Sequence, residues 1–121
     1  MYVDDDPDDQ ELFQSVLHDV QPDLECVLAK DGMDALSKLA RMEPPICIYI
    51  DINMPKMNGM ELVQKLQAHA AYKNIPAFIL STSISDADQA QLKTLGIISL
   101  SKPASYAEFT RLLAACFNAH L

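Results

Sequence analysis

The chain has 121 residues, half of them hydrophobic, and a formal net charge of −8 at pH 7. This length suits one domain with a substantial core, and we expect a single domain over residues 1–121 with no output domain in this chain. The acidic balance argues against nucleic acid as the main partner, because phosphate backbones select basic surfaces. No apolar run approaches the roughly 18–20 residues of a membrane span, and the first residues lack a secretory signal, so we expect a cytoplasmic protein.

The chain opens with a short apolar stub, 2–3, that predicts the end of a strand. Asp6 and Pro7 then supply an N-cap and a first-turn proline for a helix whose apolar residues follow at helical spacing. Residues 24–29 predict a buried strand. A second helix is expected before Pro44, with its inner face formed by Met33, Leu36, Leu39 and Ala40.

Residues 46–51 form the most strand-like segment, which is apolar on both faces until its final aspartate. Continuous apolar character is typical of a parallel strand covered on both sides. A loop rich in proline and glycine follows, and apolar residues at helical spacing predict a third helix over 59–70. Residues 77–82 predict a fourth strand.

Ser85, with Asp88 three residues later, resembles a capping box and predicts a fourth helix that Gly96 ends. A weak fifth strand over 97–101 and a last helix after Pro103 complete the pattern. Strands that alternate with helices imply a parallel sheet covered on both faces. We therefore expect an α/β, flavodoxin-like (βα)5 doubly wound fold with strand order 2-1-3-4-5.

In this topology, polar side chains converge at the carboxyl edge of the sheet: the acidic run that starts at Asp4 and Asp5, then Asp51, Ser81 and Lys102. Carboxylates gathered in one place repel each other unless a cation offsets their charge. Oxygen ligands at such an edge suit Mg²⁺. With a lysine and a hydroxyl nearby, the set favours phosphoryl transfer to a carboxylate.

The segments VDDDP, IDINMPKMNG, ST at 81–82 and SKP at 101–103 resemble the bacterial response-regulator receiver family, in its stand-alone, chemotaxis-regulator-like form. The resemblance implies that Asp51 is the phosphoacceptor and that Mg²⁺ is the cofactor. It assigns metal binding to Asp4, Asp5 and Asp51, with Asp5 as the more direct ligand, and to the backbone carbonyl of Asn53.

By the same resemblance, Ser81 is the hydroxyl that moves toward the phosphoryl group, Lys102 binds phosphate, and a cis bond precedes Pro103. The implied partners are a sensor histidine kinase or histidine phosphotransferase and a downstream protein. That protein would bind the face formed by the fourth helix, fifth strand and fifth helix, and a homodimer is possible. Only weak self-dephosphorylation is implied, so the protein is not expected to be an enzyme.

Two positions depart from the family pattern. Ser99 stands where the family usually has an aromatic residue, and Thr82 stands where it often has alanine. The first departure keeps open a degenerate receiver that serves as a docking module without phosphorylation. Two alternatives come from other classes of protein: a haloacid-dehalogenase-like phosphatase that uses Asp51 and Asn53, and a flavin-binding protein. Asp8 and Asp9 are interpreted as charges that favour a helix start.

Three cysteines occur along the chain, at positions 26, 47 and 116, and no pair has the spacing of a zinc site. An odd number of cysteines in apolar segments indicates buried thiols in a reducing compartment rather than disulfides.

Overall fold

The computed structural model describes residues 1–52, 54 and 57–120. Within them, short strands alternate with helices along the chain. The strands are β1 (Tyr2–Val3), β2 (Leu28–Ala29), β3 (Ile48–Asp51), β4 (Ala77–Ser81) and β5 (Ile98–Ser101). The helices are α1 (Pro7–Val20), α2 (Gly32–Leu39), α3 (Gly59–Ala68), α4 (Asp86–Thr94) and α5 (Tyr106–His120). The strands form one sheet in the order β2-β1-β3-β4-β5, with every pair parallel, and this confirms the expected flavodoxin-like topology.

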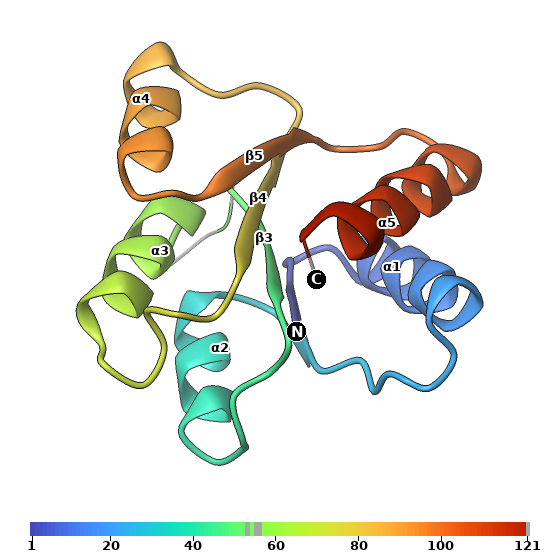
Figure 1. The fold of residues 1–121 in the computed structure, drawn as a ribbon, viewed down its shortest axis with the longest axis horizontal. Coiled ribbons are helices and arrows are strands. Elements are labelled where there is room, and N and C mark those ends of the chain that lie inside the picture. Colours follow the sequence, from blue (N-terminus) through green and yellow to red (C-terminus); the bar gives the residue numbers. More distant parts are fainter. Residues whose placement is uncertain (53, 55–56, 121) are drawn as a thin grey trace.

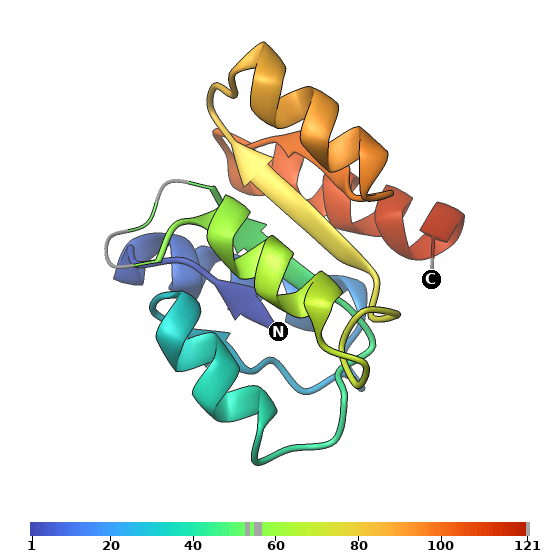
Figure 2. The same cartoon turned by 90° about the vertical axis from the view of Figure 1, so that its left-hand side faces the viewer.

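The helices cover both faces of the sheet. Helices α1 and α5 lie on one side, and α2, α3 and α4 lie on the other (Figure 1). Turned by 90°, the same three helices face the viewer in front of the strands (Figure 2). In the described part of the chain, no helix is both long and apolar enough to cross a membrane.

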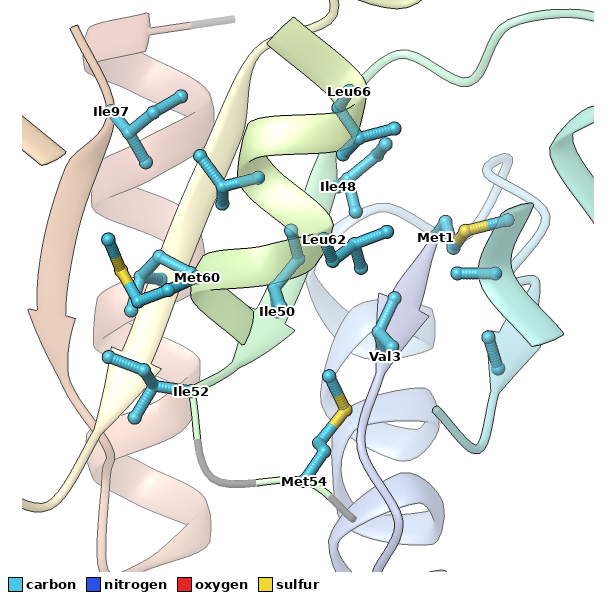
Figure 3. Packing of buried hydrophobic residues seen from close by; sticks show 14 of the residues in the cluster. Met1, Val3, Ile48, Ile50, Ile52, Met54, Met60, Leu62, Leu66 and Ile97 are labelled. Carbon is cyan, nitrogen blue, oxygen red and sulfur yellow. The ribbon is translucent and has the colours of Figure 1, made fainter. Parts of the chain in front are cut away.

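Each face of the sheet has its own core. The side of α1 and α5 is rich in aromatic rings, including Tyr2 stacked on Phe13 with ring centres 4.1 Å apart. The other side is aliphatic, and Ile50 of β3 packs there beside Leu62 of α3 (Figure 3). Because β3 is apolar on both faces and lies between the two cores, its carboxyl end is held from both sides.

Local signals in the sequence account for the helix starts. The Asp6 carboxylate accepts from the backbone N–H of Asp8, with Pro7 in the first turn, as predicted. The Ser85 hydroxyl caps α4 by accepting from the N–H of Asp88 at 3.1 Å, also as predicted. Gly96 follows the end of α4 with φ of +74°, a conformation that glycine adopts at little cost.

Three expectations about local structure were wrong. The strand predicted over 24–29 is reduced to Leu28–Ala29, because its neighbour β1 offers only two residues for pairing. Met33 is 57% exposed and Ala40 is also exposed, since α2 turns Ala35 and Leu39 inward instead. The described residues contain no cis peptide bond, so the bond before Pro103 is trans.

The thiols are free, with Cys47 and Cys116 buried and Cys26 partly buried. Burial raises the pKa of all three, which keeps them protonated near neutral pH. Their environment agrees with structural thiols.

Gly59 lets the start of α3 approach the end of β3 closely. Its N–H donates to the carbonyl of Ile52 at 3.0 Å, and a Cβ at this position would lie 2.7 Å from Ile52 Cα and 2.9 Å from Asp51 O. Both atoms belong to the backbone, so they cannot yield as a flexible side chain would.

We therefore expect Gly59→Ala to lower the free energy of unfolding by about 1–3 kcal/mol, the usual range for overpacking. Urea denaturation monitored by circular dichroism measures it. Gly96→Ala is the matched control, because no atom lies within 4 Å of its added Cβ and only the positive φ is strained. A Gly59→Ala protein as stable as the wild type would contradict the close approach.

Candidate functional site

The carboxyl ends of four strands bring the predicted site residues to one edge of the sheet. Asp4 follows β1, Asp51 ends β3, Ser81 ends β4 and Lys102 follows β5. The register pairs Asp51 with Leu80, and the N–H of Lys102 donates to the carbonyl of Ser81 at 2.9 Å. Since these residues are up to 98 positions apart in the sequence, the parallel sheet alone accounts for their meeting.

Asp4, Asp5 and Asp51 form a candidate cation site. One carboxylate oxygen from each lies within 4.8 Å of the others, and Asp5 is exposed while Asp4 and Asp51 are 0% and 7% exposed. Such a set of oxygen donors, with one side open to water, fits Mg²⁺, which usually takes one or two carboxylates and keeps several waters. Asn53, the fourth ligand expected from the resemblance, lies outside the described residues.

The Lys102 ammonium lies among carboxylates at this edge of the sheet, which we call the acidic edge. Its Nζ lies 2.7 Å from Asp9 Oδ2, 3.0 Å from Asp4 Oδ2 and 3.6 Å from Asp51 Oδ2. Burial of the ammonium works to lower the pKa of Lys102, but the hydrogen bonds to Asp9 and Asp4 and the nearby negative charges raise it more. The net pKa lies above that of an ordinary lysine, so the side chain is positively charged at neutral pH.

Asp4 is the most deeply buried carboxylate of the group. Its Oδ2 accepts from the Tyr2 hydroxyl at 2.5 Å and from Lys102 Nζ, while its Oδ1 accepts from the N–H of Asp6 at 3.0 Å. Burial, followed by the hydrogen bond to Asp4, raises the pKa of Tyr2 well above its ordinary value, so the phenol stays a donor. Charge-assisted hydrogen bonds of this kind offset the cost of burying a carboxylate.

Sequence reasoning missed two members of this site, Tyr2 and Asp9. A signal was present for Tyr2, because Tyr2 and Asp4 are two positions apart at a strand end, where such side chains share a face. No comparable signal related Asp9 to Lys102, since the two residues are far apart in the sequence. The interpretation of Asp9 as a helix-start charge alone was incomplete, because its carboxylate also pairs with Lys102.

Beside the site, Ser81 and Ser99 line a cleft of about 320 Å³ together with Thr82. Ser81 is 5% exposed and Ser99 is partly buried. The small side chain of Ser99 therefore leaves open space on this side of β4 and β5.

Tyr2→Phe removes the hydroxyl from Asp4 and keeps the ring stacked on Phe13. We expect the free energy of unfolding without metal to fall by about 1.5–3 kcal/mol, the usual value of a hydrogen bond to a charged group. Urea denaturation in EDTA at neutral pH measures it. Tyr106→Phe is the control, because the Tyr106 hydroxyl also bonds a carboxylate, that of Asp19, but on the exposed surface. Equal losses in the two variants would contradict a special role for the buried bond.

Comparisons with known proteins agree with this geometry. A family model for the response regulator receiver domain matches residues 1–114. The chain is 31% identical to the protein PilG of Pseudomonas aeruginosa, over 100% of this chain and 85% of PilG. It is also 30% identical to response regulator Rcp1 of a Synechocystis species, over 73% of this chain and 64% of Rcp1.

Solved structures show the same fold. The phosphorylated cyanobacterial phytochrome response regulator RcpA superposes with a TM-score of 0.84 at 28% identity, covering 94% of this chain and 86% of RcpA. The chemotaxis protein CheY4 of Vibrio cholerae gives a TM-score of 0.79 at 29% identity, covering 94% of this chain and 93% of CheY4.

Proposed function

The chain belongs to the response regulator receiver domain family, and we propose that residues 1–121 form one receiver domain that takes up a phosphoryl group on Asp51 with the help of Mg²⁺. One observation carries the proposal: Asp51 ends β3 beside Asp4, Asp5 and Lys102, and the Lys102 ammonium contacts the carboxylates of Asp4 and Asp51. RcpA, which shares this fold at 28% identity, is a phosphorylated response regulator.

The acidic residues and Lys102 have complementary roles in this proposal. Asp4, Asp5, Asp51 and the backbone carbonyl of Asn53 would hold Mg²⁺, which neutralises charge on the phosphoryl oxygens when bound. Lys102 offers a second positive charge 3.6 Å from Asp51 Oδ2. Without such charges, a carboxylate so close to other carboxylates would repel an anionic donor.

The reaction is an in-line displacement at phosphorus. An Asp51 carboxylate oxygen forms the new P–O bond while the P–N bond to the donor histidine breaks, and the histidine belongs to a sensor kinase or histidine phosphotransferase. The Ser81 hydroxyl then donates to a phosphoryl oxygen, and Lys102 pairs with another. Water attacks the same acyl phosphate slowly, so the protein resets itself without acting as an enzyme on other substrates.

Output through the face of α4, β5 and α5 completes the proposal. Ser81 and Ser99 line the same cleft at the side of β5, so a shift of Ser81 toward a phosphoryl group changes this face directly. A downstream protein, or a second copy of the chain, would read the change. Since Ser99 provides no aromatic ring to rotate, the signal passes through Ser81 and the segment that leads into α4.

The docking-module alternative is favoured by Ser99 alone, and the intact set of Asp4, Asp5, Asp51 and Lys102 weighs against it. The phosphatase alternative is not favoured, because the nucleophile of that family follows the first strand of its core, whereas Asp51 ends β3.

Incubation with Mg²⁺ and acetyl phosphate, followed by intact mass measurement, tests the proposal. We expect one phosphoryl adduct on the wild type, and no adduct in EDTA or on Asp51→Asn, which keeps the shape of the side chain but removes the nucleophilic charge. Mg²⁺ binding without an adduct calls for a binding measurement with beryllofluoride, a phosphoryl mimic, by ¹⁹F NMR. A wild type that forms no phosphoryl adduct and binds no beryllofluoride would contradict the phosphoacceptor proposal and favour the docking module.

A further inference from the structure

Among the ion pairs that Lys102 forms with described residues, the one with Asp9 is the shortest, although Asp9 is no member of the candidate cation site. Asp9 Oδ2 lies 2.7 Å from Lys102 Nζ, whereas Asp4 and Asp51 lie at 3.0 and 3.6 Å. The Lys102 side chain is 16% exposed and that of Asp9 is 30% exposed, so water screens this pair only in part.

An ammonium has three N–H donors, and their distribution is uneven here. The contacts to Asp9 and Asp4 are within hydrogen-bond distance, and the contact to Asp51 is beyond it. The ammonium of Lys102 therefore lies closer to Asp9 and Asp4 than to Asp51, the residue that would take up the phosphoryl group. Asp9 is its nearest partner among the described residues.

A phosphoryl group on Asp51 would bring close to two negative charges and three acceptor oxygens next to Lys102. Asp9 opposes this in two ways. Its carboxylate competes for the same N–H donors, and its negative charge repels the incoming anion. A bound Mg²⁺ is affected in the opposite sense, because an additional nearby carboxylate favours a cation.

We propose that Asp9 is a positioning residue that restrains Lys102 and weakens the hold of the site on the phosphoryl group. This inference rests on the proposed phosphoacceptor function and assigns a role to a residue other than Asp4, Asp5 and the proposed phosphoacceptor Asp51. Asp9 touches neither the phosphoryl group nor the metal in this role; it acts through Lys102 and through its charge.

The neighbouring residue Asp8 provides a matched control. Both carboxylates lie in the first turn of α1 and favour the helix start, and removal of either one changes the net charge by the same amount. Asp8 is exposed, and in the described part of the chain its carboxylate forms no ion pair with Lys102. Asp8→Asn therefore reports the loss of helix-start charge without the loss of the lysine contact.

The test measures anion and cation binding separately on the full chain. Beryllofluoride affinity at saturating Mg²⁺ is followed by ¹⁹F NMR, and Mg²⁺ affinity without beryllofluoride by calorimetry. We expect Asp9→Asn to bind beryllofluoride about two- to fivefold more tightly and Mg²⁺ no more tightly than the wild type. Asp8→Asn should leave beryllofluoride affinity within about a factor of 1.5 of the wild type, because an exposed charge is screened by salt.

Tighter beryllofluoride binding without tighter Mg²⁺ binding separates positioning from damage to the fold, because a distorted site would bind both ions less tightly. Asp9→Ser, a second uncharged variant, should show the same split if Asp9→Asn folds poorly. Equal beryllofluoride affinities in Asp9→Asn and Asp8→Asn, with a wild type that binds, would overturn the role of Asp9 and leave the proposed function intact. A wild type that binds neither ion would overturn both.

Discussion

The ammonium of Lys102 is the charge on which the arrangement of the acidic edge depends. It contacts carboxylates from the ends of β1 and β3 and from the first turn of α1, including Asp4, which is fully buried. Like charges at such distances raise the free energy of the folded state unless a cation lies among them. The same ammonium can exchange these partners for a phosphoryl oxygen, so one ion-pair cluster supports both the resting structure and the proposed reaction.

The fold places these charges through features that contain no charge themselves. Strand β3 is held between an aromatic core and an aliphatic core, and Gly59 allows α3 to begin against its carboxyl end. Tyr2 connects the aromatic core to the site, since its ring stacks on Phe13 while its hydroxyl donates to Asp4. The position of the proposed phosphoacceptor, Asp51, therefore follows from packing on both faces of the sheet.

The topology could be predicted because it had local causes: an apolar run that ends at Asp51, caps at helix starts, and alternation that implies parallel strands. The meeting of the candidate site residues at one edge of the sheet followed from that topology. Other features depended on what lay nearby in space. The extent of β2 is set by the shortness of β1, which no pattern within residues 24–29 reveals. Asp9 already had a sufficient explanation as a helix-start charge, so its contact with Lys102 emerged only from the three-dimensional arrangement.

A crystal structure with Mn²⁺ and beryllofluoride tests the central claim most directly, because anomalous scattering locates the metal and the electron density locates the phosphoryl mimic. The proposed mechanism predicts a Mn²⁺ ion in contact with Asp5 and Asp51, beryllofluoride on an Asp51 oxygen, and Lys102 within hydrogen-bond distance of a fluorine. A metal bound elsewhere, or an acidic edge without metal and mimic at saturating concentrations of both, would contradict it.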